Sequence, residues 1–233
     1  MHDFKNNIIV SADDFGIRNV AEPILSLARQ GKIDRVSVLI NYVTSKEQAE
    51  ELLATGVKID LHLELIQLIR SGERVEGSAL LRGMNFAIRS AFGLVRVSEV
   101  ERLWIDQIKA FKKMFGRYPD GLNSHEHLHY FPKFFRIALS LSERYHIPFV
   151  RFARKGIIGQ KTSMVFRILS FLWKKDSAYY DAQQQLIDTT DFFVSYDWID
   201  DFDNFLKYAP LGVTEIVFHP ERQCEYDAID KYF

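Results

Sequence analysis

The sequence predicts an α/β fold, a parallel sheet or barrel with crossover helices, formed as a single domain over residues 1–233. Short aliphatic and β-branched runs alternate along the chain with segments of helical periodicity, which is the order of repeated strand–helix units. The length suits one large α/β domain. Aspartate or histidine follows several strand-like runs, and parallel α/β folds gather functional polar residues where their strands end.

The predicted strands are short apolar runs bounded by small or turn-forming residues. The first, at residues 8–10, is β-branched and ends in Ser11 and Ala12. Further strands are expected at residues 36–40, 57–63, 121–124, 148–152 and 213–218.

The predicted helices lie between these strands, at residues 20–30, 45–53, 98–115 and 132–145. Pro23 fits the first turn of the first helix, and Gly31 is a natural stop. Ser98 and Glu101 have the spacing of a capping box. An apolar stripe with helical spacing follows them, formed by Val100, Leu103, Trp104, Ile108, Phe111 and Phe115.

Two segments, residues 72–96 and 155–191, show no clear pattern of strands and helices. We interpret them as long excursions of the same domain that form a lid or a wall of the substrate site. Within the second segment, the apolar residues 164–173 are too few to cross a bilayer. They predict a buried or interfacial amphipathic helix.

The composition is ordinary for a globular protein, with a formal net charge of -1 and 26% charged residues. This balance gives no electrostatic reason to expect a nucleic-acid partner. Cys224 is the single cysteine and has no partner for an internal disulfide. The first residues lack the pattern of a signal peptide. We therefore expect a cytoplasmic protein without a transmembrane segment.

Acidic and histidine side chains follow four of the predicted strands. Asp13 and Asp14 follow the first, His62 lies near the end of the third, His125 follows the fourth and His219 follows the last. Because the carboxyl ends of parallel strands meet at one edge, we expect these residues to converge on one site. Taken singly, the aspartate pair could cap the next helix, and His219 could be an ordinary buried histidine.

The strongest local signal is the alternating run His125, His127 and His129. Imidazole is the commonest side-chain ligand of zinc-like ions and also serves as a general acid or base. If the segment is extended, all three histidines share one side. If it turns into the following helix, only one or two of them reach a common ion. A solvated loop with incidental histidines is the alternative interpretation.

Other catalytic patterns are absent from the sequence. It contains no glycine-rich phosphate loop and no Gly-x-Ser-x-Gly elbow, which argues against a nucleotide site and a serine hydrolase. In the functional interpretation of the Asp13–Asp14 pair, one carboxylate binds a metal and the other takes a proton from water.

Five short motifs occur in order along nearly the whole chain, at residues 8–16, 61–65, 123–132, 150–151 and 215–220. They read IIVSADDFG, LHLEL, NSHEHLHYFP, VR and EIVFHP. Together they resemble the motifs of the YdjC-like carbohydrate deacetylases, the family that includes chitooligosaccharide deacetylases.

The resemblance implies a somewhat irregular (β/α) barrel of the TIM-barrel type, often a homodimer. It implies that Asp14, His62 and His125 hold one divalent metal ion, Mg²⁺ or Zn²⁺. In the same family, Asp13 would be the general base and His219 the proton donor. Residues expected to bind substrate or support the site are Asn123, His127 and Arg151.

Three departures from the family pattern stand out. Asn123 replaces a common aspartate, which weakens the expected orientation of a ligand histidine. Asp60 replaces a common glycine. Family members also usually carry a further C-terminal helix, whereas this chain ends soon after His219 and Pro220.

The function expected from these residues is hydrolysis of the N-acetyl group of an acetylated amino-sugar or oligosaccharide. One alternative is another metal-dependent hydrolase, such as a phosphoesterase, on the same barrel. The other is a non-catalytic sugar-binding member of the family.

Overall fold

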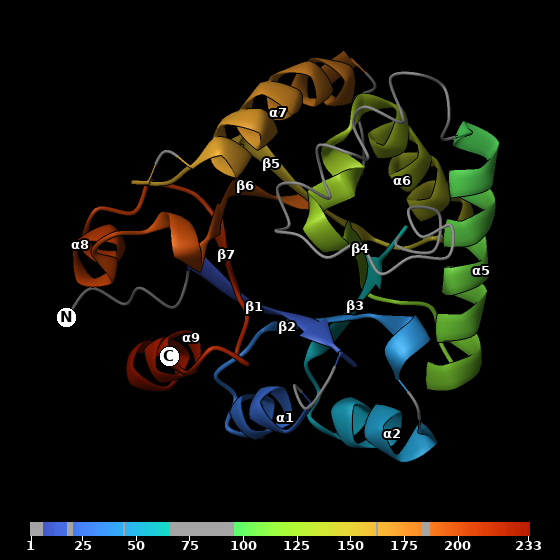
Figure 1. Cartoon of the computed structure of the whole chain (residues 1–233), viewed down its shortest axis with the longest axis horizontal. Coiled ribbons are helices and arrows are strands. Elements are labelled where there is room, and N and C mark those ends of the chain that lie inside the picture. Colours follow the sequence, from blue (N-terminus) through green and yellow to red (C-terminus); the bar gives the residue numbers. More distant parts are fainter. Residues whose placement is uncertain (1–6, 18–20, 44, 66–95, 162, 183–186) are drawn as a thin grey trace.

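The computed structural model describes residues 7–17, 21–43, 45–65, 96–161, 163–182 and 187–233. Within them, parallel strands close into a barrel in the order of the sequence (Figure 1). The strands are β1 (Ile8–Phe15), β2 (Arg35–Val38), β3 (Lys58–Leu63), β4 (Gly121–Ser124), β5 (Phe149–Ile157), β6 (Asp188–Ser195) and β7 (Thr214–Phe218). The ring closes at β1, which pairs with both β2 and β7. The predicted α/β barrel is confirmed.

The helices lie outside the barrel (Figure 1). They are α1 (Ala21–Arg29), α2 (Lys46–Ala54), α5 (Val97–Phe115), α6 (Pro132–Tyr145), α7 (Met164–Ala182), α8 (Phe202–Lys207) and α9 (Gln223–Tyr232). Short 3₁₀ helices follow three of the strands, namely η2 (Ile40–Tyr42), η3 (His125–Tyr130) and η4 (Tyr196–Trp198).

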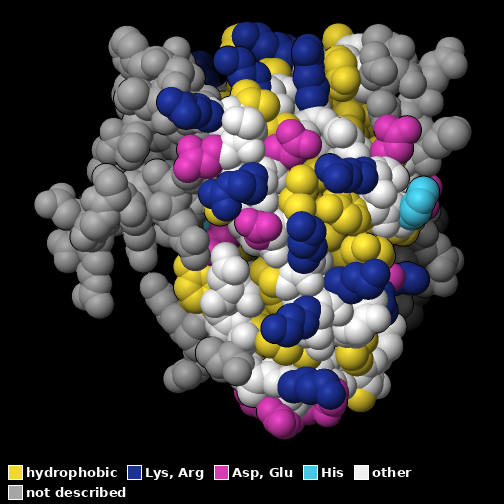
Figure 2. Space-filling model, turned by 90° about the vertical axis from the view of Figure 1, so that its right-hand side faces the viewer, with side chains coloured by type: hydrophobic (Ala, Val, Ile, Leu, Met, Phe, Trp, Pro, Cys, Tyr) yellow, Lys and Arg dark blue, Asp and Glu magenta, His cyan; other side chains and the backbone are white. Residues whose placement is uncertain are grey.

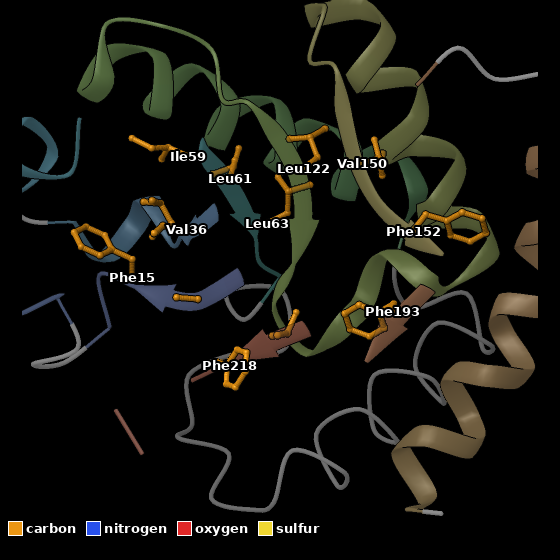
Figure 3. Close-up of a cluster of buried hydrophobic side chains, with 14 of the residues drawn as sticks. Phe15, Val36, Ile59, Leu61, Leu63, Leu122, Val150, Phe152, Phe193 and Phe218 are labelled. Atoms are coloured by element: carbon orange, nitrogen blue, oxygen red, sulfur yellow. The ribbon is translucent and has the colours of Figure 1, made fainter. Parts of the chain in front are cut away.

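Strand alternation separates a polar barrel interior from an apolar outer layer. In β3, the buried apolar residues Ile59, Leu61 and Leu63 alternate with buried Asp60 and His62. Successive strand side chains point to opposite faces, so the two sets lie on opposite sides of the sheet. Figure 3 shows the apolar set together with side chains from neighbouring strands. The side chains of β3 that point into the barrel are therefore the polar ones, Asp60 and His62.

Helix α5 carries the predicted apolar stripe, and most of its members are fully buried. The capping-box prediction is wrong, because the helix begins at Val97 and places Ser98 inside its first turn. Arg96 is the N-cap residue and makes no side-chain cap. The helix ends at Gly116 in the left-handed conformation, with a φ of 73° that glycine adopts without strain.

Helix α2 starts as the sequence predicts. The Ser45 hydroxyl accepts a hydrogen bond from the Gln48 backbone N–H at 3.2 Å. This bond satisfies one of the free N–H groups of the first turn.

The prediction that residues 155–191 form an excursion is wrong. β5 continues to Ile157, α7 crosses over, and β6 begins at Asp188, so the segment contains a regular strand–helix–strand unit. The polar start of β6, Asp-Thr-Thr-Asp, hides the apolar alternation by which strands are recognised. The other predicted excursion, residues 72–96, lies outside the described residues except for Arg96.

The apolar residues 164–173 do form part of an amphipathic helix, α7. Leu169 and Leu172 are buried, whereas Met164 and Phe171 are exposed. Among the described residues, every helix is either too short or too polar to pass through a lipid bilayer.

Two helices near the end of the chain, α8 and α9, were not predicted. α9 follows the His219–Pro220 motif, so the residues after this motif are helical. Both helices are short, and such segments carry too few apolar repeats for a clear periodic signal.

The outer face of the barrel beside α5 is chemically mixed. Figure 2 shows this face, where Lys and Arg side chains are interspersed with acidic and apolar ones. Exposed Arg102 pairs with Asp106 one helical turn away, at 3.4 Å. Such pairs contribute little to stability but help to keep a surface solvated.

Candidate metal centre and active site

The predicted site residues come from separate strands and meet inside the barrel mouth. Asp13 and Asp14 belong to β1, His62 to β3 and Arg151 to β5. His125 directly follows β4. Since all strands are parallel, their carboxyl ends lie at one end of the barrel, where barrel enzymes place their catalytic groups.

Asp14, His62 and His125 form a compact set of possible metal ligands. One ligand atom from each lies within 4.8 Å of the others. Asp14 Oδ1 is 3.0 Å from His125 Nδ1 and 3.3 Å from His62 Nε2. The backbone of Asp14 is left-handed, with a φ of 69°. This conformation is uncommon for a residue with a side chain, and such strain clusters at functional sites.

Asn123 fixes the tautomer of His62. The Asn123 amide nitrogen donates to Ser37 Oγ at 2.8 Å, which leaves its Oδ1 facing His62 Nδ1. An amide oxygen only accepts, so Nδ1 carries the proton and Nε2 keeps a lone pair on the side of Asp14. Asn123 therefore has the contacts needed to orient this ligand histidine, although it lacks the charge of an aspartate.

Asp14 and His125 each stabilise the charged form of the other. Burial alone would raise the pKa of Asp14, but the neighbouring imidazoles of His125 and His62 outweigh it and hold the pKa well below its usual range. Burial likewise opposes the charged form of His125, yet the Asp14 carboxylate raises its pKa. In the metal-free protein, a proton between His125 Nδ1 and Asp14 therefore lies where a cation would bind.

This donor set fits a divalent metal ion. Two imidazoles and one carboxylate are typical ligands of zinc-like ions, and three protein ligands leave positions open for water and substrate. The surroundings also carry negative charge, because Asp13 lies close by, with its Oδ2 3.9 Å from His62 Nε2. A bound cation would compensate the carboxylate of Asp14, which contacts no arginine in the described structure.

Asp13 faces a different partner, the fully buried Arg151. The guanidinium donates two parallel hydrogen bonds to the Asp13 carboxylate, at 2.7 and 2.8 Å. Burial would raise the pKa of Asp13, but the charge of Arg151 outweighs it and keeps the pKa well below its usual range. Arg151 also donates to Glu215 Oε1 at 2.8 Å, and Ser11 donates to the same oxygen at 2.7 Å.

Asp60 lies deeper in the barrel and is paired as well. Arg35 donates to its two carboxylate oxygens at 2.8 and 2.5 Å, and the guanidinium stacks on the Phe149 ring at 3.9 Å. Gly121 leaves room for this pair, because a Cβ there would lie only 2.6 Å from Asp60 Oδ1. Asp60 therefore belongs to a buried ion pair below the site and contacts none of the proposed metal ligands.

The run of three histidines turns away after its first member. Glu126 and His127 adopt left-handed conformations with φ of 54° and 55°, which bend the chain into η3. His129 is buried between Ser124 Oγ, at 2.7 Å, and the Arg151 carbonyl oxygen, at 2.9 Å. His129 therefore ties η3 to β5. Only His125 joins the possible metal ligands, the second outcome foreseen for this segment.

His127 lies among aromatic rings. Its ring centroid is 5.3 Å from that of Phe193 and 6.0 Å from that of Trp198. Burial, followed by the charge of Arg151, lowers the pKa of His127 to about 3, so its imidazole is neutral at physiological pH. The ring can thus offer a hydrogen bond and an apolar face, and its role in substrate binding stays a prediction.

His219 follows β7 and lies beside Glu225. The Glu225 carboxylate accepts the His219 backbone N–H at 2.6 Å and is 3.7 Å from His219 Nδ1. Burial would lower the pKa of His219, but Glu225 and the two aspartates of β1 raise it to about 9. The imidazole is therefore protonated at neutral pH, the state that a proton donor needs.

Sequence reasoning missed Glu215, Ser37 and Glu225. Glu215 is fully buried in the apolar strand β7. A single charge in an apolar run indicates a buried ionic contact, so the sequence did contain a signal for this residue. Ser37 and Glu225 gave no such signal, because their partners come from other strands or from a turn of the backbone.

The comparisons with known proteins agree with this fold and with the family resemblance. Residues 7–231 match the family model described as YdjC-like protein, so the chain belongs to the YdjC-like family. A carbohydrate deacetylase of Danio rerio is 30% identical over 138 residues, which cover 55% of this chain and 44% of the relative. A chitooligosaccharide deacetylase of Escherichia fergusonii is 26% identical, with 58% of this chain and 55% of the relative covered. The matches thus span about half the length of these relatives.

A solved structure supports the fold. A protein of Enterococcus faecalis, provisionally described as a cellobiose-phosphate cleavage protein, matches with a TM-score of 0.58 and 21% identity. The match covers 91% of this chain and 80% of that one. At this identity, the likeness supports the barrel architecture alone.

Proposed function

We propose that this chain hydrolyses the N-acetyl group of an acetylated amino-sugar with the help of one divalent metal ion. The observation that carries the proposal is the convergence of Asp14, His62 and His125, with ligand atoms within 4.8 Å of one another. The names of the relatives, carbohydrate deacetylase and chitooligosaccharide deacetylase, supply the substrate class.

A divalent ion held by these three residues would supply Lewis acidity, which polarises a carbonyl and lowers the pKa of water from ~15.7 towards ~7. Two histidines favour a zinc-like ion, and Mg²⁺ is the other candidate. In the same proposal the protein acts as a cytoplasmic homodimer.

Asp13 accepts the proton of the attacking water. The two hydrogen bonds from Arg151 keep its carboxylate ionised and fix its orientation. They also lower its basicity, so the transfer to Asp13 would need the added acidity that a divalent ion held by Asp14, His62 and His125 would give to water.

His219 donates a proton to the departing amine. The C–N bond of the amide breaks, a C–O bond forms, and the products are acetate and a free amino-sugar. A protonated imidazole is needed at this step because an amide nitrogen leaves poorly as an anion.

The test is the release of acetate by the metal-loaded protein from N-acetylglucosamine, di-N-acetylchitobiose and longer oligomers. A His125→Ala variant and a chelated sample serve as controls. Acetate from the wild type, absent from both controls, supports the proposal.

Two other outcomes would replace it. Turnover of a phosphate ester without any acetate release would favour a phosphoesterase. Binding of the sugars without turnover, in protein loaded with Mg²⁺, Zn²⁺, Mn²⁺ or Co²⁺, would favour a non-catalytic member of the family.

A further inference from the structure

Glu225 is a buried carboxylate with no part in the reaction proposed above. It lies in the first turn of α9 and is 2% exposed. Its Oε2 accepts the backbone N–H of His219 at 2.6 Å and lies 3.7 Å from Nδ1 of the same residue. That ring nitrogen is buried and has no hydrogen-bond partner among the described residues. Glu225 therefore contacts both the backbone N–H and the ring of His219.

The local backbone brings the two residues together. The Arg222 N–H donates to the His219 carbonyl at 2.9 Å, which closes a tight turn directly after β7. The Glu225 N–H then donates to the Arg222 carbonyl at 2.9 Å as the helix begins. The turn and the first helical turn thus return the Glu225 side chain to His219.

Other side chains hold Glu225 in this position. Arg222 Nη1 donates to Glu225 Oε1 at 2.8 Å, so each carboxylate oxygen has its own partner. The same nitrogen is 3.1 Å from Asp197 Oδ2, and Ser195 Oγ donates to Asp197 Oδ1 at 3.0 Å. The chain of contacts therefore links α9 to η4 and to the end of β6.

Asp197, His219 and Glu225 are also close enough to count as possible metal ligands. Arg222 already bridges the two carboxylates and supplies the positive charge that a metal would bring. We therefore interpret the cluster as a support for His219.

We propose that Glu225 is a positioning residue, which fixes the imidazole of His219 and keeps it protonated for donation to the leaving amine. Arg222 and Asp197 hold Glu225 in place. The catalytic part of this proposal rests on the proposed function, whereas the orientation and charge of His219 can be measured without any turnover.

The charged groups that act on His219 come from three elements and a turn. They are Asp13 and Asp14 of β1, Asp197 of η4, Arg222 and Glu225 at the start of α9, and the half-buried Glu221 between β7 and α9. Of the carboxylates, Glu225 alone contacts both the backbone and the ring of His219 in the described structure.

The first test is the titration of His219 by NMR in metal-free protein, in the wild type and in two variants. Glu225→Gln keeps an oxygen that can accept the backbone N–H but removes the charge. We expect the midpoint of His219 to fall by about one unit or more. Arg222→Gln removes a contact that holds Glu225 but leaves the carboxylate charge in place, so the midpoint should fall less than in Glu225→Gln. An unchanged midpoint in Glu225→Gln would overturn the proposal.

The second test is the pH dependence of acetate release. In Glu225→Gln, the alkaline limb of kcat should move to lower pH with little change in KM. The fall in kcat should be smaller than the ~10²–10⁴-fold loss on removal of a proton donor itself. If Glu225→Gln does not fold, Glu225→Asp replaces it in both tests. It retains the charge, so its His219 midpoint should stay raised, and a midpoint at the value of free histidine would contradict the proposal.

The two proposals fail in different ways. If the midpoint shifts as expected but no variant and no wild-type sample releases acetate, Glu225 still controls the charge of His219 and the proposed function is wrong. If acetate is released and the midpoint does not move, the function stands and the role of Glu225 is wrong.

Discussion

Asp13 and Asp14 are neighbours in β1 with different surroundings. Asp13 is held by the guanidinium of Arg151, whereas Asp14 contacts two histidines. A strand turns adjacent side chains to opposite faces, and the left-handed backbone at Asp14 redirects the second one towards the mouth. This difference is the physical reason for proposing Asp14 as the metal ligand and Asp13 as the general base.

Asp13→Asn should lower kcat by about 10²–10⁴-fold, because an amide does not accept the proton of water. Metal content should change little, but the free energy of unfolding should fall, because one of the two oxygens that accept from the buried Arg151 becomes an NH2 group that cannot accept. Steady-state acetate release, with metal content measured on the same samples, checks this. A near-wild-type rate would show that Asp13 is not the base.

His125 and His129 offer a matched pair within one short segment. His125→Ala should lose metal, measured by elemental analysis after dialysis, because it removes a ligand. His129→Ala should keep metal but lower the free energy of unfolding by about 1–3 kcal/mol, since the Arg151 carbonyl and Ser124 lose a buried partner. Equal metal loss in both variants would contradict the assignment.

Much of the site could be predicted from the sequence. Asp14, His62 and His125 each stand at or just after the end of a parallel strand, and this position alone predicts that they converge. The turn at Glu126 and His127 could not be predicted, because neither residue is a glycine that would indicate a positive φ. Glu225 could not be predicted either, because its role depends on a turn that brings α9 back to β7.

Strands β2 and β3 carry a charged pair below the site. Arg35 and Asp60 are both buried, and each neutralises the other. Asp60→Leu should lower the free energy of unfolding by about 3–5 kcal/mol, because it leaves a buried guanidinium without its partner. Urea unfolding measures this.

The double variant Arg35→Met with Asp60→Leu is the control. It should recover most of that stability, because two apolar groups replace the pair. If the double variant is as unstable as the sum of the single ones, the pair is not an isolated unit.

The elements that could be predicted are those with unbroken patterns. α5 shows its stripe over 19 residues, and β3 alternates cleanly. β6 could not be recognised because its first half is polar. It becomes a strand by pairing with β5 and β7, contacts between distant segments that have no local signature.

The shifted pKa values of His219 and His127 predict a stability maximum near neutral pH in the metal-free protein, and Asp176, whose pKa burial raises to about 8, adds to the loss as pH rises. The pKa of His219 rises from 6.5 to about 9 on folding, so its contribution is present below pH ~6.5 and is lost as pH rises through 9. The pKa of His127 falls to about 3, so stability is lost as pH falls from ~6.5 towards 3, where the unfolded chain alone binds this proton.

Urea unfolding across pH 4–10 checks this prediction. The alkaline decline should be on the order of 1–3 kcal/mol, and His219→Gln should reduce it, leaving the part that Asp176 contributes up to about pH 8. A decline of equal size in His219→Gln would assign the alkaline limb to other groups.

The Arg35–Asp60 pair also bears on how this protein has diverged from its relatives. A carboxylate at position 60 is tolerated inside the barrel because an arginine at position 35 reaches it and because residue 121 is a glycine. A change at one of these positions alone would leave a buried charge or a steric clash. Relatives with a glycine at position 60 should therefore lack the arginine at position 35, and an alignment should show the two positions changing together.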